Sequence, residues 1–183
     1  MRIVTITSAG SLKGNGMVLL TAKILKELGV DFEWRVAGNI ARFLKFEKSN
    51  DIRHEDVNIK LLGMISAEDI AHELANADFY VHPSIIDNSP NSLCEAQLIG
   101  CPIVATHVGG IPQMVQDGKT GILYPYNEPH TLAFTLIGLK ESREKMERLS
   151  TNELMVSKER HNPEELGKRL IEIYNEIISM AQK

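Results

Sequence analysis

The sequence predicts an α/β fold built on a parallel, doubly wound sheet, and two features of its 183 residues support this prediction. Short runs rich in β-branched residues alternate along the chain with longer segments in which apolar residues recur at helical spacing. Glycine or proline stands at most junctions between these segments, where chains turn. Such alternation is typical of a Rossmann-like sheet with helices on both faces. Ligands of these sheets bind at the carboxyl ends of the strands, so we expect the functional residues in the loops that follow them.

The first half of the chain contains three predicted strands, each followed by a helix. The strands are expected at residues 2–7, 32–37 and 57–62, and the helices at 17–28, within the charged segment 39–55, and from 66 to about 75. A glycine-rich loop, residues 8–16, joins the first strand to the first helix. Ser66, three residues before Asp69, is typical of a helix N-cap.

The middle of the chain consists of a strand, a polar loop, a helix and a second strand. The first strand is expected at residues 77–82, and Pro83 fits a chain leaving the sheet because proline cannot donate to a ladder. Ser89 before a proline predicts an N-cap for a helix over residues 90–99. Residues 101–106 are apolar and β-branched, which predicts a parallel strand buried on both faces.

The last third of the chain is predicted to be mostly helical. A short helix at 111–115 and a strand at 121–124 are followed by helices at 128–138 and 141–156. The final helix, at about residues 163–181, is amphipathic. One of its faces carries Leu166, Leu170, Ile173, Tyr174 and Ile177.

The polar loop and the helix after it predict an anion site. The first N–H groups of a helix lack partners and its dipole is positive there, so Asn91, Ser92 and Leu93 are expected to present N–H groups to an anion. Asp87 and Glu95 stand on either side of these residues. Because carboxylates accept hydrogen bonds from sugar hydroxyls, this pattern favours a ligand with both phosphate and sugar, such as a nucleotide sugar.

The same stretch resembles the donor-binding segment of family 4 retaining glycosyltransferases of the GT-B fold. Many of those proteins read E-N-S-P-N-S-L-x-E-A, and this chain reads D-N-S-P-N-S-L-C-E-A at residues 87–96. The similarity continues through G-C-P-I-V-A-T at 100–106, V-G-G-I-P at 108–112 and D-G-K-T-G-I-L at 117–123. Asp87 replaces the usual Glu and is one methylene shorter.

The resemblance implies roles for residues in three loops. Lys13, followed by glycine in the first loop, resembles the family lysine that contacts the donor diphosphate, although the arginine that many relatives carry just before it is missing here. Asp87 is expected to contact the donor sugar and to favour positive charge at the anomeric carbon, which makes Asp87 and Lys13 the expected catalytic residues. Met64 and Ile65 follow the third strand, where relatives hold the nucleobase.

The remaining expected donor contacts lie on the helix after the polar loop. The resemblance implies that Glu95 holds the ribose hydroxyls, and that Ser89, Asn91, Ser92 and Leu93 surround the phosphates. Taken alone, several of these residues have ordinary interpretations. Asp87 also fits a loop turn, Lys13 and Glu95 fit solvated surface positions, and Ser89 fits a cap.

Two further features have equally balanced interpretations. Gly109 and Gly110 fit either an ordinary tight turn or a place where the backbone approaches another group closely. His82 fits either a diphosphate contact or a hydrogen-bonded histidine at the end of a strand.

Composition and motifs exclude several classes of site and partner. The formal net charge of −4, without a basic run, does not indicate nucleic-acid binding. The loop Gly14-x-Gly16-x-x-Leu19 lacks the third glycine of a dinucleotide fingerprint. The histidines share no ligand spacing and no Asp-x-Asp occurs, so we expect no metal and no cofactor beyond the nucleotide sugar substrate. Cys94 and Cys101 are interpreted as buried thiols of a cytoplasmic protein.

The resemblance covers residues 1–183 as one nucleotide-sugar-binding, C-terminal domain, so we expect a fragment that lacks the N-terminal, acceptor-binding domain. The full-length protein is expected to transfer a sugar, with retention, from a nucleotide donor to a hydroxyl of a glycan or lipid-linked acceptor. It is expected in the cytoplasm, peripherally associated with the inner face of the membrane, and the isolated domain is expected to be inactive. Two alternatives remain open: a non-catalytic nucleotide-sugar-binding module, and a sugar-nucleotide epimerase of GT-B architecture.

Overall fold

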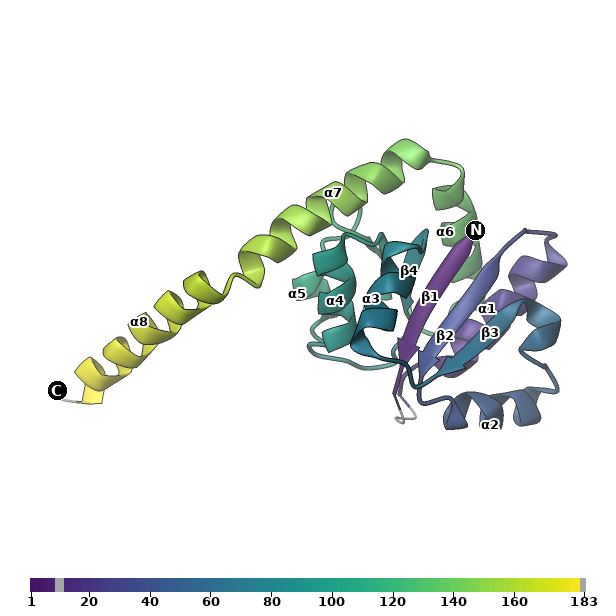
Figure 1. The fold of residues 1–183 in the computed structure, drawn as a ribbon, viewed down its shortest axis with the longest axis horizontal. Coiled ribbons are helices and arrows are strands. Elements are labelled where there is room, and N and C mark those ends of the chain that lie inside the picture. Colours follow the sequence, from purple (N-terminus) through teal and green to yellow (C-terminus); the bar gives the residue numbers. More distant parts are fainter. Residues whose placement is uncertain (9–11, 182–183) are drawn as a thin grey trace.

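A parallel sheet forms the centre of the computed structural model, which describes residues 1–8 and 12–181 and contains six strands within them (Figure 1). In the order of the chain these are β1 (Arg2–Thr7), β2 (Glu33–Gly38), β3 (Ile59–Gly63), β4 (Phe79–His82), β5 (Ile103–Thr106) and β6 (Ile122–Tyr124). All neighbouring pairs are parallel, and the strand order is β3-β2-β1-β4-β5-β6. The direction of winding reverses between β1 and β4, which confirms the predicted doubly wound sheet.

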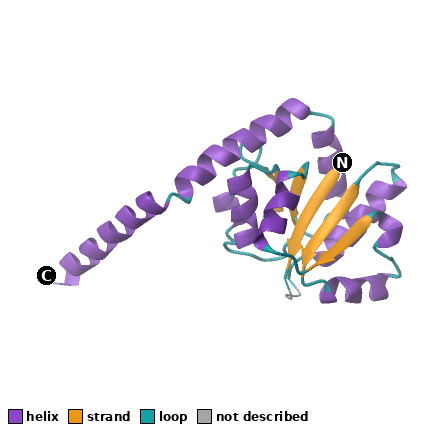
Figure 2. Cartoon of the chain, viewed as in Figure 1, coloured by secondary structure: helices purple, strands orange, loops and turns teal. Residues whose placement is uncertain are grey.

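Helices cover both faces of the sheet (Figure 2). Helices α1 (Asn15–Glu27) and α6 (Pro129–Lys140) pack against each other, as do α3 (Ala67–Ala75) and α4 (Asn91–Ile99). Helix α7 (Arg143–Arg160) runs across α4, and α8 (Pro163–Ala181) extends away from the rest of the domain (Figure 1). The remaining helical segments are α2 (Ala41–Asn50), the 3₁₀ turn η1 (Glu55–Val57) and α5 (Ile111–Met114).

Each face of the sheet has its own hydrophobic core, because successive strand side chains point to opposite faces. In β4, Phe79 and Val81 join the core beneath α1 and α6, whereas Tyr80 joins the core beneath α3 and α4. The single tryptophan, Trp34, is fully buried in the first core and donates its Nε1 proton to Thr5 Oγ1 at 3.1 Å. All four strand residues of β4 are buried, as predicted for a central strand.

Most element boundaries agree with the predictions within two or three residues. The predicted cap of α3 is confirmed, since Ser66 Oγ accepts a hydrogen bond from the Asp69 N–H at 3.0 Å. The strand predicted at 57–62 begins later, because residues 55–57 form a 3₁₀ turn and Asn58 has φ of 56°. The strand predicted from 101 begins at 103, after Pro102, whose nitrogen has no proton to donate.

Helix α8 leaves its apolar face uncovered. None of its residues is buried in the described structure, and the five predicted face residues are between 43% and 57% exposed. Among the residues that the structure describes, no helix is long and apolar enough to cross a lipid bilayer.

Candidate functional site

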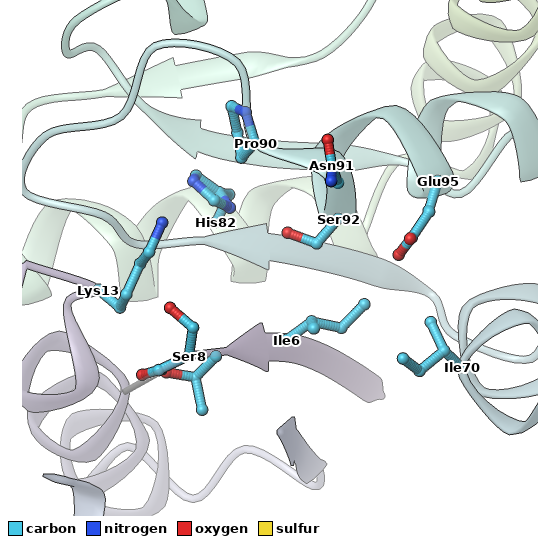
Figure 3. A pocket seen from close by; sticks show the side chains of 10 residues that line it. Ile6, Ser8, Lys13, Ile70, His82, Pro90, Asn91, Ser92 and Glu95 are labelled. Atoms are coloured by element: carbon cyan, nitrogen blue, oxygen red, sulfur yellow. The ribbon is translucent and has the colours of Figure 1, made fainter. Parts of the chain in front are cut away.

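A pocket of about 280 Å³ lies at the carboxyl ends of β1 and β4, the two strands between which the winding reverses. Figure 3 shows Lys13 and Glu95 at opposite ends of this pocket, with Ser92 between them. Asn91 also lines it, so the structure brings together four of the residues predicted for the site. The position agrees with the rule that doubly wound sheets bind ligands where the strand order reverses.

Two loops, from different strands, hold Lys13 at the pocket. The Ile85 N–H donates to the Leu12 carbonyl at 2.7 Å, which ties the loop after β1 to the loop after β4. Gly14 has φ of 67°, and a Cβ there would lie 1.8 Å from the Pro83 carbonyl oxygen. Only glycine therefore fits this contact, and it keeps the preceding Lys13 close to the polar loop. Residues 9–11 of the first loop, part of the segment in which relatives carry an arginine, lie outside the described residues.

Lys13 and Asp87 form an ion pair with each other. The resemblance had implied separate contacts, from Lys13 to the donor diphosphate and from Asp87 to the donor sugar. Lys13 Nζ lies 2.5 Å from Asp87 Oδ2. Burial raises the pKa of Asp87, but the Lys13 ammonium more than offsets this effect and holds the pKa below its usual value. The Asp87 carboxylate is therefore charged and paired with Lys13. A ligand that binds either side chain must compete with this ion pair. Asp87 itself is not part of the pocket lining.

The Gly109–Gly110 turn supports the loop that carries Asp87. The Gly110 N–H donates to the Asp87 carbonyl at 2.9 Å. A Cβ on Gly109 would lie 2.1 Å from the Asp87 carbonyl oxygen, and one on Gly110 would lie 2.1 Å from the Asn88 carbonyl oxygen. Of the two interpretations left open for these glycines, the close approach is confirmed, and the group approached is the backbone of residues 87–88.

The predicted cap of α4 is wrong. Pro90, with φ of −71° and ψ of 125°, is the N-cap, and Ser89 makes no capping bond. Proline can occupy this extended position because its ring requires a φ near this value and an N-cap needs no N–H. The Leu93 N–H donates to the Pro90 carbonyl at 3.0 Å, so Leu93 does not present its N–H to a ligand as predicted. Asn91 and Ser92 precede this bond, and no described residue accepts a hydrogen bond from their N–H groups.

Glu95 lies at one end of the pocket, and the loop after β3 does not line it. Glu95 lies on the exposed surface of α4 at the far end of the pocket from Lys13 (Figure 3). Met64 is 80% exposed, and neither Met64 nor Ile65 lines the pocket. Ile70 of α3 lines the pocket beside Glu95 and was not predicted. The nucleobase contact expected at Met64 and Ile65 stays a prediction.

A buried hydrogen-bonded group that the sequence did not predict lies behind the pocket. Tyr80 Oη donates to Ser92 Oγ at 2.8 Å and lies 3.0 Å from His82 Nδ1. His82 is 2% exposed, and its Nε2 lies 3.4 Å from Asp87 Oδ2 at an angle too poor for a hydrogen bond. Burial lowers the pKa of His82 to about 4, and the Lys13 charge adds to the effect while Asp87 opposes it. His82 is therefore neutral at physiological pH.

The described residues also allow a test for metal-binding clusters. Within residues 1–8 and 12–181, no three His, Cys, Asp or Glu side chains are grouped to hold a metal ion. Cys101 is buried and Cys94 is half-buried. Burial raises the pKa of both thiols, to about 12 for Cys101, so both are protonated at neutral pH.

Comparison with known proteins connects this geometry to a family. The family described as glycosyl transferases group 1 matches residues 2–154. The chain belongs to this family. Amylovoran biosynthesis glycosyltransferase AmsK from Erwinia amylovora is 28% identical to this group 1 domain over 149 residues, which cover 77% of the domain and 36% of AmsK.

Solved structures agree on the fold of this group 1 domain. Anabaena HepE, crystallised in complex with UDP-glucose, superposes with a TM-score of 0.80 at 20% identity, over 96% of the domain and 48% of HepE. The C-terminal domain of a group 1 glycosyl transferase from Francisella tularensis superposes with a TM-score of 0.71 at 20% identity, over 87% of this domain and 85% of that chain. The predicted family and the predicted fold, a Rossmann-like half of a GT-B protein, are confirmed. The domain spans about a third of AmsK and about half of HepE.

Proposed function

We propose that this group 1 domain binds a nucleotide sugar, and that the full-length protein transfers the sugar to a hydroxyl acceptor with retention at the anomeric carbon. One observation carries the proposal: a single pocket joins a cation, a helix N-terminus and a carboxylate at the reversal point of the sheet. The cation and the helix N-terminus both attract the negative oxygens of a diphosphate, and the carboxylate can accept hydrogen bonds from ribose hydroxyls. HepE, which has the same fold, was crystallised with UDP-glucose.

The diphosphate occupies the Lys13 end of the pocket. The N–H groups of Asn91 and Ser92 and the Lys13 ammonium bind its oxygens, because a helix N-terminus and a cation both attract anions. As the bond between sugar and phosphate breaks, negative charge grows on the leaving diphosphate. The same groups stabilise that charge in place, which supplies the electrostatic part of catalysis.

Donor binding also changes the Lys13–Asp87 ion pair. In the free domain the two side chains neutralise each other at 2.5 Å. A bound diphosphate draws the Lys13 ammonium onto its own oxygens and leaves the Asp87 carboxylate free to accept hydrogen bonds from sugar hydroxyls. The freed carboxylate then favours positive charge at the anomeric carbon. Because Lys13 and the helix N-terminus supply the positive charge, donor binding requires no metal ion.

The acceptor hydroxyl is supplied by an N-terminal domain outside this chain, so the isolated domain binds donor but transfers nothing. This part of the proposal is supported by HepE, of which the chain spans only about half. AmsK is named for the biosynthesis of a polysaccharide, amylovoran, which supports a glycan or lipid-linked acceptor. We place the full-length protein in the cytoplasm, at the inner face of the membrane.

Calorimetric titration of UDP, GDP and ADP into this chain tests donor binding. We expect one of the three to bind, and Glu95→Ala to weaken it about 10- to 100-fold, because a hydrogen bond to a charged group contributes roughly 1.5–3 kcal/mol. Glu176→Ala, on the exposed surface of α8, is the matched control and should bind like the unmodified chain. EDTA should change nothing. Equal binding by Glu95→Ala and the unmodified chain would refute the ribose assignment.

A further inference from the structure

The hydroxyl of Tyr80 connects two residues of the pocket without reaching the pocket itself. The side chain is fully buried in β4, and its hydroxyl lies 2.8 Å from Ser92 Oγ and 3.0 Å from His82 Nδ1. Ser92 and His82 both line the pocket and Tyr80 does not. A phenylalanine would fill the same apolar space, so the hydroxyl must be explained by the two polar contacts that it makes.

The number of protons limits the direction of these bonds. The tyrosine hydroxyl has one proton and can donate to only one of its two neighbours, of which Ser92 Oγ, at 2.8 Å, is the nearer. The His82 ring nitrogen beside it, Nδ1, must then be the donor of the second contact, so neutral His82 carries its proton on Nδ1. The other ring nitrogen, Nε2, is consequently bare. Among the described residues, Nε2 makes no hydrogen bond of good geometry, although the Asp87 carboxylate lies 3.4 Å away.

Among the residues that the structure describes, the same order leaves the proton of Ser92 without a partner. Ser92 Oγ accepts from Tyr80, so its own O–H must point elsewhere, and Ser92 is half-buried with its remaining exposure in the pocket. In the first turn of α4, an O–H directed into the pocket acts beside the N–H groups of Asn91 and Ser92. The opposite order would present lone pairs of Ser92 to the ligand and would repel an anion.

We propose that Tyr80 is a positioning residue of the donor site: with His82 behind it, Tyr80 turns the Ser92 hydroxyl into a proton donor for the bound diphosphate. The inference rests on the proposed function, because it assumes that this pocket binds the diphosphate. It adds the Ser92 hydroxyl to the N–H groups of Asn91 and Ser92 and to the Lys13 ammonium, which is the one cationic side chain among the described residues that line the pocket.

Tyr80→Phe tests this role with inorganic pyrophosphate and the nucleoside diphosphate that binds best as ligands. We expect Tyr80→Phe to weaken both about tenfold, which corresponds to one hydrogen bond to a charged acceptor. Tyr124→Phe is the matched control: Tyr124 is equally buried, but no polar group of the described chain bonds its hydroxyl, so binding should be unchanged. In a Ser92→Ala background, Tyr80→Phe should cause no further loss, since Tyr80 acts through Ser92.

Long-range ¹H–¹⁵N spectra of the His82 ring give a second readout that needs no ligand. We expect the Nδ1–H tautomer in the free chain, and an Nε2–H tautomer would overturn the inference whatever binds. Unchanged binding by Tyr80→Phe, or full additivity with Ser92→Ala, would overturn it while leaving the proposed function intact. If neither pyrophosphate nor any nucleoside diphosphate binds the unmodified chain, the proposed function fails and the role of Tyr80 fails with it.

Discussion

The contact between Gly110 and the loop that carries Asp87 allows a sharp test of how the site is built. Gly110 has φ of −86° and ψ of −4°, a conformation that any residue adopts. Substitution by alanine therefore introduces no backbone strain and adds only the Cβ atom. That atom would lie 2.1 Å from the Asn88 carbonyl oxygen.

The cost of Gly110→Ala follows from this distance. The loop must retreat by roughly 1.3 Å before the contact reaches the 3.4 Å at which ordinary packing begins. Such a movement also breaks the 2.9 Å bond from the Gly110 N–H to the Asp87 carbonyl. Overpacking costs about 1–3 kcal/mol and a lost hydrogen bond about 1 kcal/mol, so the free energy of unfolding should fall by roughly 2–4 kcal/mol.

Urea denaturation, followed by the fluorescence of Trp34, measures this change. Trp34 is the single tryptophan and is fully buried, so its emission reports unfolding of the sheet. With an m-value of about 2 kcal/mol/M, the midpoint should fall by roughly 1–2 M. Gly138→Ala is the control: Gly138 lies within α6 with nothing near its missing Cβ, so this variant should be more stable by about 0.5–1 kcal/mol. If the urea midpoints of Gly110→Ala and Gly138→Ala shift in the same direction by the same amount, the close approach of Gly110 to the Asn88 carbonyl is refuted.

Two other substitutions test buried or paired charges. Glu153 of α7 is fully buried, and within the described part of the chain neither carboxylate oxygen has a partner at hydrogen-bond geometry. Burial raises its pKa above the usual 4.5, while Thr120, Gln97 and Arg160 lower it only in part. The folded state therefore holds this proton more tightly than the unfolded state, and stability is lost as the pH rises from about 4.5 through the folded pKa. Glu153→Gln should stabilise the chain by about 1–3 kcal/mol at neutral pH and by much less near pH 4 in urea titrations, and a pH-independent effect would contradict this reasoning. Lys13→Met should raise the pKa of Asp87, because burial then acts without the ammonium, and carbon NMR of the carboxylate measures this pKa. Lys45→Met on α2 should leave that pKa unchanged, and equal values in the two variants would argue against the ion pair in solution.

Local sequence determined the elements of this protein and the segment where its site lies. Hydrophobic periodicity and the positions of glycine and proline depend only on neighbouring residues, so they predicted the alternating strands and helices. The order of residues 87–96 likewise located the helix N-terminus with Asn91, Ser92 and Glu95. The errors within this segment were local: Pro90 replaced Ser89 as the N-cap, which in turn removed the Leu93 N–H from the expected donors.

The connections between segments were decided only by the tertiary structure. Lys13 and Asp87 are 74 positions apart, and their ion pair depends on the adjacency of β1 and β4 and on the fit of Gly14 against Pro83. The bond from Tyr80 to Ser92 depends in the same way on how α4 packs over β4. A strand pattern specifies which face a side chain occupies but not which helix covers that face. Sequence therefore identified the chemical groups of this site, and the order of the strands and the packing of the loops determined which of them meet.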